Sequence, residues 1–203
     1  MNIKKIINTT LKFAINRVIE ILGGFVSIIG LLLLIALISY SPNDPNFIFP
    51  ENTEITNLLG FQGSYISDLF FQSIGVISYL ISITLIVTGV NIFKSKDLFL
   101  IIENMFYVVF YSFLGALFFS FFYPDAFNLY INGNGGFVGH YLNQTFFADL
   151  IKLQKQVSFY FLILLILVLF LISINFNPKK FWSYIKIIIK YFNIDIVKNY
   201  TFK

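Results

Sequence analysis

A glycine-rich segment that carries the only histidine of the chain offers the clearest opportunity for chemistry. It runs from Asn132 to Tyr141, with the sequence NGNGGFVGHY. Glycine-rich loops bind phosphate where they join a strand to a helix, and the common nucleotide loop continues into a lysine. No strand pattern precedes this segment and no lysine follows its glycines. It therefore predicts a turn that lets backbones pack closely, rather than a nucleotide site.

Other reactive side chains are equally sparse. The chain has no cysteine, which excludes disulfides, thiol nucleophiles and iron–sulfur clusters. His140 has no acidic cluster beside it, whereas a zinc site draws on several such ligands. We therefore expect no catalytic residue, no cofactor and no metal, and the chain is not predicted to be an enzyme.

Two acidic residues bear on transport. Glu20 follows Arg17 by one helical turn, a spacing at which side chains pair, and Glu103 lies near the start of a later apolar segment. Ion and proton pathways place their ionisable groups inside the membrane. Neither acid reaches mid-membrane, and no proline interrupts an apolar segment. A small four-span transport or export protein is therefore the alternative function, without support from ionisable residues.

The elements that position these residues are membrane-spanning helices. Of the 203 residues, 58% are hydrophobic and only 12% are charged, against about 25% charged in a soluble domain. A bilayer-spanning helix needs about 20 mainly apolar residues. The sequence therefore predicts an all-α membrane protein with one domain of four spans, residues 19–176. The expected spans are about residues 19–40, 69–93, 98–122 and 157–176.

The distribution of lysine and arginine predicts the orientation. With both termini in the cytoplasm, twelve basic residues lie inside and two, Lys152 and Lys155, lie outside. Cytoplasmic loops carry the excess of such residues. We therefore expect both termini to be cytoplasmic, Asp44 and His140 to lie on the other side, and the inner membrane to be the location.

The flanks of the membrane domain are basic. Residues 1–18 form one tail and residues 177–203 the other. In the second tail Lys186 and Lys190 are four apart, while Ile185 and Ile189 fall on another face and Trp182 suits the interface. This predicts a basic amphipathic helix on the inner leaflet, with the lipid bilayer as partner. Weak DNA contact by the lysines is the alternative, and we expect no specific nucleic-acid binding.

The first loop has two distinctive parts. Pro42, Asp44 and Pro45 follow the first span directly, and prolines at this spacing predict a rigid exit from the membrane. Further on, glycines permit tight backbone, and a helix that starts near Ser64 leads into the second span. We therefore expect a bent re-entry into the membrane.

Small and hydroxyl residues in the spans predict helix contacts. Small stripes let helix backbones approach closely in lipid, and we expect the third-span stripe to face another span. The fourth span has no stripe, so it lies at the bundle edge or faces another subunit of a homo-oligomer. The hydroxyl side chains of the second span can bond back to their own helix. The packing residues are Gly23 and Ser27 in the first span and Ser112, Ala116 and Ser120 in the third.

The motifs, in this order, resemble the N-terminal membrane domain of the FtsK/SpoIIIE family of bacterial DNA translocases. The resemblance covers roughly residues 17–175 and is sharpest at Ser39–Phe47, which is similar to the family's Ser-Pro-x-Asp-Pro exit. The residues that carry it are Arg17, Glu20, Pro42, Asp44, Pro45, Asn57, Gly60, Gly63, Asp68, Gly75, Gly135, Gly136 and Gly139.

The resemblance implies four transmembrane helices followed by a long cytoplasmic linker and a hexameric motor ATPase. It also implies an anchor at the division septum that contacts other division proteins. No glycine in the 203 residues is followed by lysine, so the Walker A phosphate loop is missing from them. The hypothesis is an inner-membrane anchor and protein-interaction domain that acts in cell division and chromosome segregation without a motor of its own.

Overall fold

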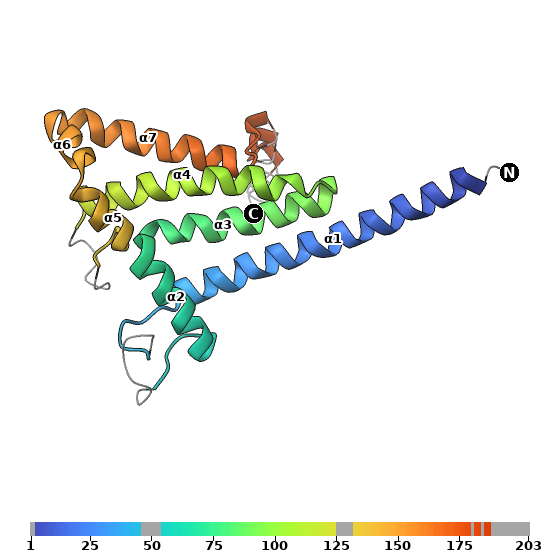
Figure 1. Cartoon of the computed structure of the whole chain (residues 1–203), viewed down its shortest axis with the longest axis horizontal. Helices are drawn as coiled ribbons and strands as arrows, with labels where there is room; N and C mark the ends of the chain where they lie inside the picture. Colours follow the sequence, from blue (N-terminus) through green and yellow to red (C-terminus); the bar gives the residue numbers. More distant parts are fainter. Residues whose placement is uncertain (1–2, 46–53, 125–131, 180, 184, 188–203) are drawn as a thin grey trace, which may run out of the picture.

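The computed structural model describes residues 3–45, 54–124, 132–179, 181–183 and 185–187. The described residues form helices and connections (Figure 1). The helices, with one 3₁₀ turn, are α1 (Ile3–Ile38), α2 (Gly60–Ile74), η1 (Gly75–Ile77), α3 (Ser78–Ser95), α4 (Phe99–Phe122), α5 (Gly136–Asn143), α6 (Phe146–Leu153) and α7 (Lys155–Ser173).

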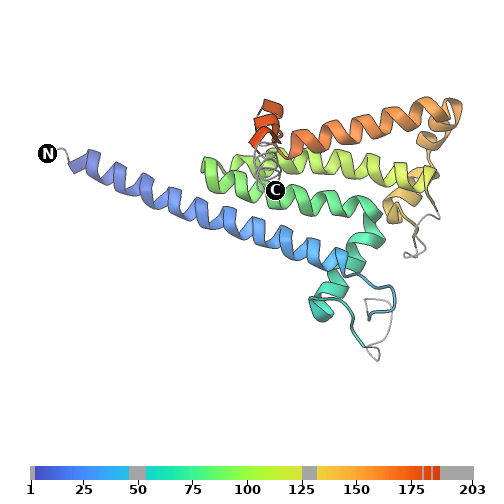
Figure 2. The same ribbon diagram turned by 180° about the vertical axis from the view of Figure 1, so that it is seen from behind.

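Four segments are long and apolar enough to cross a membrane, which confirms the predicted number of spans. They are Ile7–Ile38, Gly60–Ser95, Phe99–Phe122 and Lys155–Ser173. α1, α3, α4 and α7 lie roughly side by side, and α1 packs on α3, α3 on α4, and α4 on α7 (Figures 1 and 2). The chain is therefore a multi-pass membrane protein.

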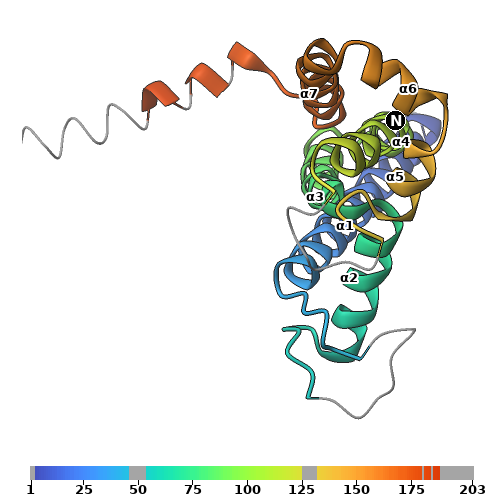
Figure 3. The ribbon, with the colours of Figure 1, turned by 90° about the vertical axis from the view of Figure 1, so that its left-hand side faces the viewer.

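The two ends of the bundle differ. At one end, α2, α5 and α6 gather with the connections that follow α1 and α4 (Figure 1). We call this the cap end, formed by the described residues of 39–77 and 123–154. The other end carries Arg17, the α3–α4 turn and the exit from α7, and we call it the tail end. Figure 3 shows the helical turns after Pro178 leading away from the bundle.

α1 is longer than the expected first span. It is one continuous helix from Ile3 to Ile38, so the described part of the predicted tail, residues 3–18, is helical and continues α1 (Figure 1). Residues 3–22 contain neither glycine nor proline, the residues that most strongly interrupt a helix. The boundary expected near residue 19 is where the sequence of α1 changes from charged to apolar, and it is not where the helix starts.

The second span is not the single helix expected over residues 69–93. The helix begins at Gly60 rather than near Ser64, and it is interrupted by η1, after which α3 runs in a new direction (Figure 1). The cause is Gly75, whose φ of 71° is left-handed. Ser78 Oγ donates to the Gly75 carbonyl at 2.6 Å and closes the turn. α3 then forms the second part of the membrane-spanning segment Gly60–Ser95.

The third and fourth spans lie close to their predicted positions. α4 occupies residues 99–122 and α7 residues 155–173. Between them, the segment expected as a loop contains α5 and α6, which pack at the cap end (Figure 1). Of the expected tail helix, Lys190 and the residues after it lie outside the described residues.

α1 and α3 approach closely along small residues. A Cβ added to Gly23 would lie 2.7 Å from the amide nitrogen of Phe93 and 2.8 Å from the carbonyl oxygen of Gly89. Ser27 Oγ donates to the Ile86 carbonyl at 2.9 Å. Close contact and interhelical hydrogen bonds hold helices together where lipid removes the hydrophobic driving force. Gly23 and Ser27 are thus placed at a helix contact, while Gly24 faces open space.

Candidate functional site

Asp44 organises the connection that leaves α1. It is 1% exposed, and its carboxylate accepts hydrogen bonds from Thr56 N at 2.9 Å, Thr56 Oγ1 at 2.8 Å and Asn57 N at 2.8 Å. Pro42 and Pro45 flank it. Hydrogen bonds to an ionised acceptor are about twice as strong as neutral ones. Asp44 therefore joins the start and the end of the first connection.

Asn57 caps the end of α1. Its side-chain amide donates to the carbonyl of Ala36 at 2.9 Å and to that of Ser39 at 3.2 Å. The last carbonyls of a helix lack partners within the helix, so Asn57 supplies them. Leu59 N in turn donates to Asn57 Oδ1 at 3.1 Å. Asp44 and Asn57 together fix how the chain turns back after α1.

α2 is docked onto this connection through small residues. A Cβ at Gly63 would overlap Asn57 Oδ1, so only glycine leaves space for the cap. One residue on, Ser64 Oγ donates to the Pro45 carbonyl at 2.8 Å. We call Asp44, Pro45, Asn57, Gly63 and Ser64 the exit junction. Gly60 opens α2 with a φ of 65°.

Asp68 lies one turn further along α2. It is 4% exposed, and its Oδ1 accepts from Tyr40 Oη at 3.1 Å and from Gln72 Nε2 at 3.4 Å. The bond from Tyr40 ties α2 back to the residues that follow α1, and the bond from Gln72 lies within α2. Asp68 thus extends the contacts of the exit junction rather than forming a separate site.

A second junction joins the glycine-rich segment to the break between α2 and α3. Val76 N donates to the Asn134 carbonyl at 2.9 Å, and a Cβ at Gly75 would overlap that same carbonyl. Across the contact, a Cβ at Gly136 would lie 2.6 Å from Ile74 N. We call Ile74, Gly75, Val76, Asn134 and Gly136 the Gly75 junction. The glycines of the two loops face each other here.

The small-residue stripe of α4 lies against the same glycine-rich segment. Cβ atoms added to Gly135 and Gly139 would overlap the Ala116 carbonyl and lie within 3.0 Å of Ser120 Cβ. The structure thus corrects the expectation that this stripe faces another span, because α5 covers Ala116 and Ser120. Ser112, 7% exposed, lies one turn further from the cap end.

Enlarging Ala116 should separate α5 from α4. Ala116 is fully buried, so the Ala116→Leu variant adds bulk where backbones touch, and overpacking costs about 1–3 kcal/mol of unfolding free energy. Val168→Leu adds one methylene on α7 at a residue that is 41% exposed and should be nearly silent. Thermal unfolding in detergent compares the two variants; equal small effects would show that α5 does not pack on Ala116.

At the tail end, Glu20 joins α1 to the turn between α3 and α4. Its carboxylate pairs with Arg17 one turn earlier, as the spacing predicts, and with Lys96 Nζ at 3.1 Å. Lys96 follows α3 in a left-handed conformation, with φ of 61°. The Lys96 contact links α1 to the α3–α4 turn and was not expected from the sequence.

A polar network connects α3, α4 and α7, and sequence reasoning missed it. Thr84 Oγ1 contacts Tyr111 Oη at 3.0 Å and Ser173 Oγ at 3.1 Å. Nearer the tail end, Asn104 Nδ2 donates to Thr88 Oγ1 at 2.8 Å. Ser82 donates to the Tyr79 carbonyl of its own helix, as is possible for the hydroxyls of the second span, whereas the Thr84 and Thr88 hydroxyls also contact side chains of other segments.

The end of α7 belongs to the same network. Asn175 has a φ of 50°, and its Oδ1 accepts from Asn104 Nδ2 at 3.2 Å and from Asn91 Nδ2 at 3.4 Å. α7 is therefore held to α3 and α4 by side-chain bonds instead of small residues. Asparagines within apolar segments were the available signal, because polar groups in lipid need partners.

The hydrogen bonds and ion pairs described above join separate segments of the chain to one another. His140 is exposed and shares a hydrogen bond with Gln144. Among the described residues no group of three acidic, histidine or cysteine side chains is placed to hold a metal. The family-motif residues lie in several places: Asp44, Pro45, Asn57 and Gly63 in the exit junction, Gly75 and Gly136 in the Gly75 junction, Arg17 and Glu20 in an ion pair, and Gly135 and Gly139 against Ala116.

Comparison with known proteins agrees with this architecture. The family described as the 4TM region of DNA translocase FtsK/SpoIIIE matches residues 16–186. The chain is 35% identical over 75 residues to the DNA translocase FtsK of Caulobacter vibrioides, covering 37% of this chain and 9% of that protein. It is 34% identical over 85 residues to the FtsK of Rickettsia bellii, covering 42% of this chain and 11% of the relative.

The chain thus matches only about a tenth of the length of these relatives. No solved structure matches it. The family match extends from the residue before Arg17, across all four spans, to the turns after α7, and so includes both junctions at the cap end. The chain therefore belongs to the FtsK/SpoIIIE 4TM family.

Proposed function

We propose that residues 1–203 anchor a DNA-translocating machinery in the bacterial inner membrane at the division septum. In this role the four spans hold the domain in the bilayer, and the cap end contacts other division proteins. The family membership supports the anchor role, and the relatives carry the name DNA translocase. DNA movement itself is assigned to a motor that these residues do not form.

The observation that carries the proposal is the construction of the cap end. Asp44, Asn57 and the Gly75 junction hold α1, α2 and α5 in fixed positions there. Such a surface suits recognition by a partner, because a pre-ordered surface loses little entropy on binding.

The polar network between α3, α4 and α7 does not support the alternative that the chain is a transport protein. The groups that it places between α3, α4 and α7 are neutral hydroxyls and amides, and they bond to one another. Interhelical bonds of this kind join helices in membranes. We therefore assign the network to helix association.

Orientation is the first test of the proposal. We expect a reporter fused after Lys203 to be active in the cytoplasm and one inserted at Glu54 to be active in the periplasm, because twelve of the fourteen lysines and arginines lie in the two terminal segments and between the second and third spans. A fluorescent protein suits the first position and alkaline phosphatase the second. Phosphatase activity of a fusion after Lys203 would contradict the proposed orientation.

The anchor role is tested by complementation. Residues 1–203 are expressed in cells depleted of a relative's translocase, with division and chromosome segregation scored separately. Rescue limited to division supports an anchor that works through protein contacts.

A further inference from the structure

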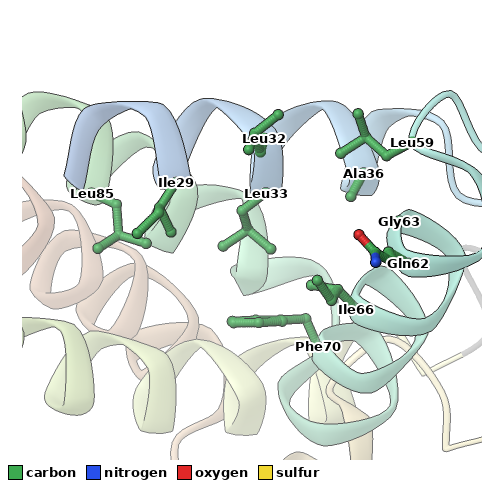
Figure 4. Close-up of a pocket in the computed structure, with 10 residues that line it drawn as sticks. All are labelled: Ile29, Leu32, Leu33, Ala36, Leu59, Gln62, Gly63, Ile66, Phe70 and Leu85. Carbon is green, nitrogen blue, oxygen red and sulfur yellow. The ribbon is translucent and has the colours of Figure 1, made fainter. Parts of the chain in front are cut away.

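An apolar groove opens between α1 and α2 in the membrane domain (Figure 4). Its volume is about 440 Å³. Leu33 and Ala36 of α1 form the buried part of the groove lining. Leu32 of α1 is 44% exposed and Ile66 of α2 is 41% exposed, and these two residues form the margin of the groove. Among the ten lining residues, Gln62 alone carries a polar side chain. The groove exists because η1 turns α2 away from the line of α3.

The groove lies at the level of the bilayer interior nearer the cap end. From Glu20, where the ion pairs mark the tail end, α1 rises to Ser39, 19 residues and roughly 29 Å further on. That length matches the hydrocarbon thickness of about 30 Å. The α1 residues of the groove, from Ile29 to Ala36, occupy the second half of this rise. The occupant must therefore be a group that belongs in hydrocarbon.

An acyl chain fits the same space. An apolar cavity of about 150 Å³ takes up benzene, with its six carbons, so about 440 Å³ accommodates roughly 18 carbons. This is the size of one fatty-acyl chain. The exposed margin at Leu32 and Ile66 gives lateral access from the leaflet.

Charge selects the headgroup. Residues 41–68, which connect the spans beside the groove, contain four acidic residues and no lysine or arginine. Asp44 and Asp68 are buried in their hydrogen bonds, whereas Glu54 is exposed. An anionic headgroup would be repelled here, while a zwitterionic one brings an amine. The Gln62 amide can donate to a phosphate or ester oxygen.

We propose that the α1–α2 groove binds one acyl chain of a zwitterionic phospholipid. The acyl chain fills the space that the bend at η1 opens, and there it contacts both α1 and α2. This site is independent of any septal role, because it requires only that the spans lie in a bilayer. Its failure would leave the proposed anchor function intact.

The test counts retained lipid. The full chain is reconstituted with equal amounts of phosphatidylethanolamine and phosphatidylglycerol that carry identical acyl chains, and is then extracted in mild detergent for native mass spectrometry. We expect one phosphatidylethanolamine per chain. The Leu32→Trp variant fills the groove and should lower its occupancy by at least about tenfold.

Leu31→Trp is the matched control, because Leu31 is 49% exposed on the same helix but does not line the groove. Its lipid occupancy should equal that of the wild type. Ile66→Trp fills the groove from α2. If Leu32→Trp fails to fold, the lipid occupancy of Ile66→Trp tests the proposal in its place. Unchanged retention in a folded groove-filling variant, equal loss in the control, or predominant retention of phosphatidylglycerol would overturn the proposal. So would a drop in oligomeric state caused by Leu32→Trp, which would indicate a protein occupant.

Discussion

Replacing Asp44 by alanine should lower the free energy of unfolding by about 2–4 kcal/mol, one of the two largest effects expected in this domain. The carboxylate is 1% exposed and accepts three hydrogen bonds, two of them from the backbone amides of Thr56 and Asn57. Its removal leaves buried donors without partners and frees Asn57, the cap of α1. Thermal unfolding in detergent measures the loss.

Two variants show whether the loss comes from these bonds. Asp44→Asn keeps one acceptor oxygen but turns an amide donor toward a backbone donor, so it should be intermediate. Asp149→Ala removes a carboxylate that is 76% exposed and paired only with Lys152, and it should change stability by less than about 0.5 kcal/mol. An Asp44→Ala variant as stable as Asp149→Ala would refute the role assigned to the exit junction. An enzymatic activity lost on that change would also refute it, since Asp44 is assigned no catalytic role.

Replacing Gly75 by alanine should be at least as damaging. The residue has a φ of 71° and a ψ of −148°, a conformation found almost only for glycine, which costs a residue with a Cβ about 1–3 kcal/mol. The added Cβ would also overlap the backbone carbonyl of Asn134, which no side-chain rotation can relieve. Together these effects should destabilise the domain by about 3–5 kcal/mol and release the glycine-rich segment from the α2–α3 break.

Gly60→Ala separates the two causes. Gly60 has a φ of 65°, yet a Cβ there would meet no atom within 4 Å. This variant should therefore show only the backbone cost of about 1–2 kcal/mol. Proteolysis of the segment between α4 and α7 provides a second measurement, since it should accelerate in Gly75→Ala and not in Gly60→Ala. Equal behaviour of the two variants would mean that the Gly75 junction is not a close contact.

The spans were predictable because length and polarity alone define them. α4 and α7 begin within two residues of their expected positions, since charged or polar residues bracket each apolar run. The interruption at Gly75 was not predictable in the same way, because a single glycine within an apolar run is common in membrane helices. Its effect depends on Asn134, which lies far along the chain and supplies the opposing carbonyl.

The sequence predicts a rigid turn and close packing at the cap end, but it does not predict which residues make the contacts. The prolines around Asp44 indicate a rigid turn, whereas the bond from Asn57 to the Ala36 carbonyl depends on how the chain returns over α1. Likewise, the glycine-rich segment predicts close packing, and only the fold shows that Ala116 is its partner. Long-range partners of this kind are set by tertiary structure, which a local pattern does not contain.

Complementation is the measurement that tests the anchor role most directly. Residues 1–203, fused to a fluorescent protein, are expressed in cells of Caulobacter vibrioides depleted of their own translocase. The account predicts enrichment at the septum and improved division, with chromosome segregation still defective, because no residue here is assigned to couple ATP hydrolysis to DNA movement. Restoration of segregation by residues 1–203 alone, or a uniform membrane distribution with no effect on division, would contradict it.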